Sequence, residues 1–275
     1  MEIKKFSFRG KIKGKDGITL VDFLSEVTPL SKSLIKKHAN NGGVWIKKRG
    51  VGPFSRIRRV KTSLTSLDHI ECHYDPNLPE VDMELVKPIF ETKDWGIWYK
   101  PAGVLSEGTK FGDQASMIRH IERDKPHAFP IQRLDRETSG IMVIAYREKV
   151  SRIFSGSVKK GMIKTYFQAE VLGKLRSSEG DIEFDIDGRK SKTTYKVLEE
   201  FEHSSLVELD LITSRFHQAR QHLAKIKHPI IGDPKYGRHN KNSDGLKLVA
   251  YKVVLKDPIS KKDHLFTLPE ELRLF

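Results

Sequence analysis

The chain has 275 residues, a formal net charge of +14 and a hydrophobic content of 37%. This length suffices for a buried core, and the hydrophobic content excludes a wholly disordered chain. No apolar run approaches the ~18 residues of a membrane span, the N-terminus lacks a secretory signal, and the single cysteine, Cys72, excludes internal disulfides. We therefore expect a cytoplasmic protein, without contact with membranes, and a monomer.

The positive charge is concentrated in the first quarter of the chain. Residues 1–75 hold 16 Lys and Arg against 7 Asp and Glu, whereas the remaining residues hold 34 against 29. Lys and Arg side chains bind nucleic acid by releasing counterions from its phosphates, although a surface charged only for solubility is the alternative. We predict a basic binding module over 1–75, a linker over 76–93 and a larger domain over 94–275.

The basic module is predicted to contain a strand, two helices and further short strands. Apolar residues at helical spacing predict a helix over 20–27 after the N-cap candidate Thr19, and Ser31 or Ser33 can cap a second helix over 34–39. Strands are expected over 44–47 and 68–74. Candidate contacts to nucleic acid are the cations of this region: Lys36, Lys37, Lys47, Lys48, Arg49, Arg58 and Arg59.

The larger domain is predicted to be mainly strands with few helices between them. Strands are expected over 96–99, 141–145, 162–172, 181–186, 192–200, 205–212, 248–255 and 264–268. One helix is expected to end near Gly161, and another spans 216–227, with Ser214 as its N-cap and Phe216 in its apolar stripe. Short connections between the strands favour an α+β fold with a mixed, mainly antiparallel sheet.

Several common catalytic motifs are absent from the sequence. The glycine pair in residues 10–16 is one residue too close for a phosphate-binding loop, and Asp16 stands where such a loop needs Ser or Thr. His217 and His222 are five residues apart, whereas a helical zinc site of the HExxH type needs four. The sequence therefore indicates neither a metal nor a bound cofactor.

A carboxylate between two arginines stands directly before a predicted buried strand. The segment Gln132-Arg-Leu-Asp-Arg-Glu-Thr-Ser-Gly places Asp135 between Arg133 and Arg136. Cationic neighbours keep a carboxylate ionised, as a nucleophilic aspartate requires. An ordinary ion pair in a loop fits the same spacing, and that alternative stays open at this point.

Two further polar segments accompany this carboxylate. In Ser214-Arg-Phe-His-Gln-Ala-Arg-Gln-His-Leu, helical spacing places His217, Arg220 and Gln221 on one side, from which an arginine can reach Asp135. In Lys164-Thr-Tyr, strand alternation places the Lys164 and Tyr166 side chains on one face. Either pattern alone also fits a solvated helix face or a half-buried strand.

Together these segments resemble the RluA family of RNA pseudouridine synthases. The resemblance rests on four blocks that extend over most of the chain: Lys100-Pro-Ala-Gly, Arg133-Leu-Asp-Arg-Glu-Thr-Ser-Gly, Lys164-Thr-Tyr, and Phe216-His-Gln-Ala-Arg-Gln-His with His228-Pro-Ile-Ile-Gly-Asp-Pro-Lys-Tyr-Gly. It implies a pseudouridine synthase fold with a central catalytic cleft, and the N-terminal region resembles the S4 RNA-binding domain. The chain departs from the family at Gln132, which replaces a usual histidine, and at Ser214, which replaces a usual glycine.

By position, the resemblance implies roles for four side chains. Asp135 would be the catalytic aspartate, Arg220 its paired arginine, Tyr166 the ring that stacks on the target uracil, and Arg133 a contact to RNA. The activity implied is conversion of uridine to pseudouridine in structured RNA, without cofactor or metal. Ribosomal RNA is the expected substrate and transfer RNA the alternative. A non-catalytic RNA-binding or ribosome-assembly factor on the same scaffold is the competing hypothesis.

Overall fold

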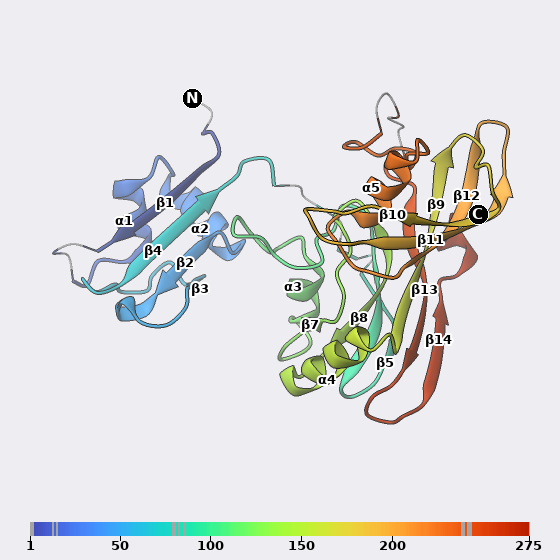
Figure 1. Cartoon of the computed structure of the whole chain (residues 1–275). Coiled ribbons are helices and arrows are strands. Elements are labelled where there is room, and N and C mark those ends of the chain that lie inside the picture. The colour runs from blue at the N-terminus through green and yellow to red at the C-terminus, as the bar shows by residue number, and fades with distance from the viewer. Residues whose placement is uncertain are drawn as a thin grey trace. The chain divides into compact units, whose positions relative to one another are not determined.

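The chain divides into two compact units. The structure, a computed structural model, describes residues 3–12, 14, 16–78, 81, 83–84, 86–237, 240 and 244–274. One unit comprises Met1–Asp82 and Glu107–His120, and the other Met83–Ser106 and Ile121–Phe275 (Figure 1). The N-terminal unit thus extends past the predicted boundary at residue 75 and includes a segment from the middle of the chain. No helix within the described ranges has the length and apolar character needed to cross a membrane.

The N-terminal unit is a small sheet with two helices. Its sheet has the order β1-β4-β2-β3, and all its pairings are antiparallel. The elements are β1 (Phe6–Lys11), α1 (Leu20–Val27), α2 (Lys32–Asn40), β2 (Val44–Lys47), a 3-10 turn (Lys48–Gly50), β3 (Ser55–Arg56) and β4 (His69–Tyr74). The predicted order of a strand, two helices and short strands is confirmed.

Side-chain caps determine where the two helices begin. The Thr19 hydroxyl accepts a hydrogen bond from the Asp22 backbone N–H, so that α1 starts at Leu20, as predicted. Of the two candidates for α2, Ser31 is the cap, because its hydroxyl accepts from the Leu34 N–H. The helix therefore begins two residues before its predicted start.

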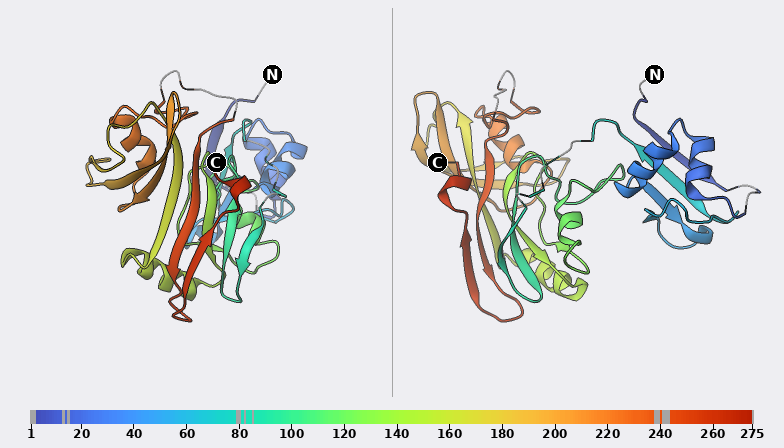
Figure 2. Two further views of the ribbon diagram at one scale, coloured as in Figure 1. Left: turned by 90° about the vertical axis from the view of Figure 1, so that its right-hand side faces the viewer. Right: turned by 180° about the vertical axis from the view of Figure 1, so that it is seen from behind.

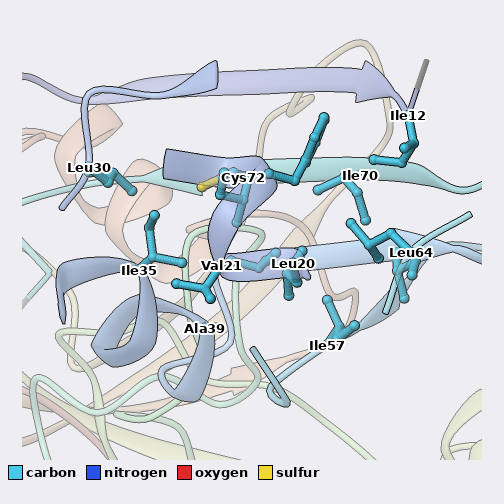
Figure 3. Close-up of a cluster of buried hydrophobic side chains, with 14 residues drawn as sticks. Ile12, Leu20, Val21, Leu30, Ile35, Ala39, Ile57, Leu64, Ile70 and Cys72 are labelled. Atoms are coloured by element: carbon cyan, nitrogen blue, oxygen red, sulfur yellow. The ribbon is translucent and has the colours of Figure 1, made fainter. Parts of the chain in front are cut away.

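The apolar sides of these elements form one core. Buried side chains of α1 and α2 meet those of β2 and β4, as shown for Leu20, Ile35, Ile70 and Cys72 (Figure 3). The Cys72 thiol is among them, and burial raises its pKa to about 12. Because an uncharged thiol in such surroundings packs as a small hydrophobic group, Cys72 has a structural role here.

The second segment of the N-terminal unit is attached through an aspartate. Asp113, in Glu107–His120, lies 2.6 Å from Nη2 of Arg58 and 3.2 Å from Nε of Arg56. All three side chains are largely shielded from solvent. Two arginines therefore converge on one carboxylate and hold this segment in the unit.

The C-terminal unit is built on one ten-stranded sheet. Its main path is β10-β11-β12-β9-β13-β8-β6-β5, with β14 paired to β13 and β7 to β8 (Figure 2, where β13 and β14 are red). Only the pairing of β13 with β8 is parallel among the described strands, so the predicted α+β fold with a mainly antiparallel sheet is confirmed. The elements are β5 (Pro88–Glu91), β6 (Trp95–Lys100), β7 (Phe129–Pro130), β8 (Ser139–Ala145), α4 (Glu148–Lys159), β9 (Ile163–Leu172), β10 (Glu179–Glu183), β11 (Lys192–Glu200), β12 (Ser204–Leu211), α5 (Gln218–Lys225), β13 (Leu248–Lys256), β14 (Asp263–Thr267) and a 3-10 turn (Glu270–Leu272). A short helix, α3 (Met117–Ile121), lies at the boundary of the two units.

Two helices pack against different parts of this sheet. α4 contacts β7, β8 and β9, and its Phe154 ring lies 5.5 Å from that of Trp95 in the core. α5 contacts β10, β11 and β12 (Figure 1). The prediction for α5 is wrong at its start: the helix begins at Gln218, because His217 adopts a left-handed conformation with φ of 53°. Phe216 consequently lies outside the helix and is 61% exposed, instead of packing in the apolar stripe.

Candidate active site

A cavity of about 590 Å³ opens in the C-terminal unit. It is lined by the loop before β8, the end of α4, β9, the end of β12 and the start of α5, and Asp135, His217 and Arg220 all face it. The loop that carries Asp135 and the start of α5, which are far apart in the sequence, therefore meet at one cavity. Within the described ranges, no three His, Cys, Asp or Glu side chains are grouped as metal ligands would be.

The backbone on both sides of Asp135 is held by the segment that follows β6. The Ser106 hydroxyl donates to the Leu134 carbonyl at 2.7 Å and accepts from the Leu134 N–H at 2.9 Å. On the other side, the Gly103 N–H donates to the Arg136 carbonyl at 2.8 Å. The aspartate loop is thus fixed at the residue before Asp135 and at the residue after it.

Lys100 lies beneath the same loop and is fully buried. Its ammonium group donates to the carbonyls of Val104 at 2.7 Å, Pro101 at 3.1 Å and Arg136 at 3.2 Å. Burial lowers the pKa of Lys100 to about 7, against the opposing effect of the nearby Glu137 carboxylate. The Lys-Pro-Ala-Gly block therefore serves to support the aspartate loop from within.

Gly140 allows the strand after the loop to approach its neighbour closely. It has φ of 130°, and a Cβ at this position would lie 2.3 Å from the Ala250 carbonyl oxygen. The parallel pairing of β8 with β13 at this point therefore requires glycine. This contact fixes the end of the aspartate loop against β13.

Arg220 binds a second aspartate more closely than Asp135. The resemblance implies a pair with Asp135, but Nε and Nη2 of Arg220 each donate to Asp233 at 2.8 Å. The remaining Nη1 lies 3.8 Å from Asp135 and 3.6 Å from Glu137, and it has no hydrogen-bond partner. Arg220 is 2% exposed, so this free N–H group is a buried donor beside the carboxylate.

Asp233 is the residue of this site that the sequence reasoning missed. It is fully buried, and Oδ1 also accepts from the backbone N–H groups of Lys235 and Tyr236. Burial opposes its ionisation, but the hydrogen bonds from Arg220 and this backbone outweigh burial and lower its pKa. The Gly-Asp-Pro sequence within the last resemblance block was the available signal, since an aspartate between turn-forming residues commonly binds its own backbone.

His217 is the second group beside Asp135. Its Nε2 lies 3.7 Å from Oδ2 of Asp135, and its Nδ1 lies 3.2 Å from the Tyr236 hydroxyl. Burial lowers the pKa of His217, and the carboxylate of Asp135 opposes this. The left-handed backbone at His217 is uncommon for a residue other than glycine, and it turns the ring into the cavity.

The electrostatics of Asp135 differ from the sequence-based interpretation. Burial raises the pKa of its carboxyl group, and the charges of His217 and Arg220 act in the opposite direction. Arg220 is the arginine that the resemblance paired with Asp135, whereas the effect expected of the flanking Arg133 and Arg136 comes from His217 instead. The carboxylate therefore titrates above the ordinary aspartate range in a largely desolvated site.

The other predicted residues of the larger domain have different surroundings. Arg133 lines the cavity. Tyr166 does not line it: the ring is half-buried against the core, with the Lys252 ammonium 4.3 Å from its centre. The stacking role of Tyr166 therefore stays a prediction. Gln221 does not line the cavity either, and its side chain donates to the Phe216 carbonyl at 2.8 Å.

The predicted RNA contacts of the N-terminal unit are mostly exposed. Arg58 is the exception, because its guanidinium is bound by Asp113 and the Asn40 carbonyl. Lys48 is exposed but lies 3.4 Å from the buried Asp68. The side chains at the surface are Lys36, Lys37, Lys48, Arg49 and Arg59, and Lys47 is half-exposed.

The chain shares sequence and fold with enzymes that modify RNA. Residues 94–225 match the RNA pseudouridylate synthase family. An uncharacterized RNA pseudouridine synthase of Bacillus subtilis, YhcT, is 32% identical over 90% of this chain and 87% of its own length. Ribosomal large subunit pseudouridine synthase C of Vibrio parahaemolyticus is 29% identical over 78% of this chain and 74% of its own. The chain spans 66% of the length of a relative from Mycoplasma genitalium and 50% of the length of one from Nitrosomonas europaea.

A solved structure agrees with this relationship at the level of the fold. Human RNA pseudouridylate synthase domain containing 1 superimposes with a TM-score of 0.59 at 19% identity, over 70% of this chain and 86% of its own. The region that matches the family in sequence, residues 94–225, includes the aspartate loop, the Lys-Pro-Ala-Gly block beneath it and the start of α5. The chain belongs to the family of RNA pseudouridine synthases.

Proposed function

We propose that this protein converts uridine to pseudouridine in ribosomal RNA, with Asp135 as the catalytic carboxylate. The observation that carries the proposal is the position of Asp135 in a cavity of about 590 Å³, within 4 Å of a histidine and of a buried arginine. A cavity of this size is in the range of sites for small ligands, and a flipped nucleobase is such a ligand.

The reaction needs no external reactant. The bond between N1 of uracil and C1′ of the ribose breaks, the base turns, and a bond forms between C5 and C1′, while C5 loses its proton and N1 gains one. Asp135 acts on the sugar or base, and the Nη1 donor of Arg220 stabilises the ionised carboxylate. Tyr166 is proposed to stack on the uracil, a contact worth ~1–3 kcal/mol per base.

The N-terminal unit is proposed to bind the RNA backbone as an S4-like module. Its exposed cations, among them Lys36, Arg49 and Arg59, suit phosphate contacts that do not read sequence. Arg133 is proposed to contact RNA at the cavity itself. Ribosomal RNA is favoured over transfer RNA because relatives from Vibrio and Nitrosomonas are named as ribosomal large subunit synthases.

Release of tritium tests the activity directly. RNA from a strain that lacks the gene, labelled at C5 of uridine, is incubated with the purified protein, and we expect label in water at the rate of product formation. Asp135→Asn, which keeps the shape of the side chain, should abolish release. Sequencing for pseudouridine in ribosomal and transfer RNA, with and without the gene, identifies the substrate.

A non-catalytic role predicts the opposite result. If the chain were an assembly factor, the wild type would release no label, and Asp135→Ala would complement the deletion strain fully. The buried Arg220 and Asp233 pair beside Asp135 supports catalysis, since an RNA-binding scaffold has no need of a desolvated carboxylate.

A further inference from the structure

Phe216 and His217 form a stacked pair of rings beside the aspartate cavity. Their ring centres are 3.7 Å apart with an interplanar angle of 22°. His217 lines the cavity, and the residue before the pair, Arg215, lines it as well. Phe216 therefore lies at the rim of the cavity. Its ring stacks on that of His217, whose Nε2 lies 3.7 Å from Oδ2 of Asp135.

The exposure of Phe216 is unusual for this protein. Of the phenylalanines that the structure describes, only Phe216, at 61%, and Phe184, at 39%, have exposed side chains. An isolated exposed apolar side chain requires no explanation. Phe216, however, is held in place: its ring rests on His217, its carbonyl accepts from Gln221, and the His217 ring is itself held by the Tyr236 hydroxyl.

One cation lies over the Phe216 ring, and a second lines the neighbouring cavity. The Lys235 ammonium lies 5.4 Å from the centre of the Phe216 ring. Arg215 adds a second positive charge at the cavity wall. Rings with neighbouring cations are the pattern with which proteins bind single-stranded nucleic acid, where bases stack on the rings and phosphates pair with the cations.

We infer that Phe216 stacks on the nucleobase next to the target uridine. This inference rests on the proposed function and extends it to a neighbouring nucleotide: when the uridine leaves the helix for the cavity, an adjacent base loses its stacking partner, and Phe216 replaces that partner at the rim. His217 supports the ring from beneath and thereby couples the stacked base to the position of Asp135. Lys235 and Arg215 bind the intervening phosphates.

The test compares variants of Phe216 with a matched control. Phe216→Ala removes the ring, Phe216→Trp keeps an aromatic face, and Phe216→Leu keeps apolar bulk alone. Phe184→Ala is the control, because Phe184 is also exposed and also lies 5.4 Å from a lysine ammonium, that of Lys225. The two residues beside Phe184 in the sequence do not line the cavity, whereas Arg215 and His217, beside Phe216, do. Since Phe216 is exposed, its truncation leaves no core void, and thermal unfolding of each variant checks this.

We expect Phe216→Ala to lower kcat/KM for the mapped RNA substrate about 5- to 150-fold, mostly through KM. Phe216→Leu should behave similarly, and Phe216→Trp and Phe184→Ala should stay within about twofold of the wild type. An abasic site at the nucleotide on one side of the target should cost the wild type the same factor and cost Phe216→Ala almost nothing more, because both changes remove one contact. Additive losses at both neighbours, or an unaffected Phe216→Ala, overturn the inference.

The two levels of the proposal fail in different ways. A wild type without activity on any RNA overturns the proposed function. The stacking is then still tested by binding: oligouridylate with one 2-aminopurine should lose fluorescence on the wild type and on Phe184→Ala, and keep it on Phe216→Ala. Equal quenching by all three proteins would overturn the inference that a base stacks on Phe216, whether or not the wild type is active.

Discussion

Arginine and aspartate are combined in opposite ratios in the two units. In the N-terminal unit, Arg56 and Arg58 converge on the one carboxylate of Asp113. In the C-terminal unit, the single Arg220 is shared by Asp233, Asp135 and Glu137. The first arrangement neutralises an acid and fastens a segment, whereas the second leaves carboxylate in excess inside a cavity. The same two residue types thus fasten a segment in one unit and form part of the candidate active site in the other.

The largest difference between the two units should appear in stability when the aspartate that binds arginine is removed from each. Asp233→Ala leaves the charge of Arg220 buried without its bidentate partner, and we expect the free energy of unfolding of the C-terminal unit to fall by about 3–5 kcal/mol. Asp113→Ala leaves Arg56 and Arg58 with their hydrogen bonds to backbone carbonyls, so the N-terminal unit should lose less, about 1 kcal/mol. Hydrogen exchange along the chain under increasing urea measures both. Equal losses would contradict the contrast.

The second prediction concerns Lys100, the buried cation of the C-terminal unit. Its pKa is about 7 in the folded chain, against an ordinary 10.5, so between these values the unfolded chain binds more protons. The free energy of unfolding should therefore rise by about 1 kcal/mol per pH unit from pH 7.5 to 9.5 on this account. Lys100→Met removes that contribution. Urea titrations at several pH values compare the two proteins, and identical slopes would show that Lys100 does not titrate there.

A smaller effect is expected from His217 on the acid limb of activity. Burial raises the pKa of Asp135, and protonated His217 lowers it. His217→Gln removes the charge, so the pH at which activity is half lost on the acid side should move upward by less than about one unit. The pH profile of kcat/KM shows the shift. A limb that moves to lower pH would mean that the group limiting activity is not Asp135.

The smallest effect should appear in the salt dependence of RNA binding. Lys36→Ala and Arg59→Ala each remove an exposed cation, and each should reduce the slope of log K against log salt by about 0.7–0.9. Arg58→Ala should leave the slope nearly unchanged, because Asp113 already binds this arginine. Binding isotherms at four salt concentrations are sufficient. A reduced slope for Arg58→Ala would contradict this and indicate that Arg58 contacts a phosphate.

Local signals in the sequence predicted the elements whose ends are capped nearby. The start of α1 follows from Thr19, and β11 has the predicted bounds, 192–200. The start of α5 did not, because the left-handed turn at His217 is imposed by packing that periodicity does not show. Phe216 was consequently assigned to the core, although it is exposed.

The sequence predicted which residues form the site better than it predicted which of those residues bind one another. The resemblance identified Asp135 and Arg220, and the structure brings them to 3.8 Å. It could not reveal that Asp233 takes the bidentate position, since this contact joins a helix to a loop thirteen residues further on. Equally, nothing local shows that Glu107–His120 belongs with residues near the N-terminus, because that association depends on Arg56 and Arg58.

The membership of Glu107–His120 in the N-terminal unit changes how that unit can be separated from the rest. The chain passes between the units at three peptide bonds, 82/83, 106/107 and 120/121. Deletion of residues 1–75 would leave this segment without the arginines that bind Asp113. A cut at the first connection alone should give a split protein, in which the N-terminal fragment stays associated through that segment. An exchange of the N-terminal unit between relatives therefore has to transfer both segments together.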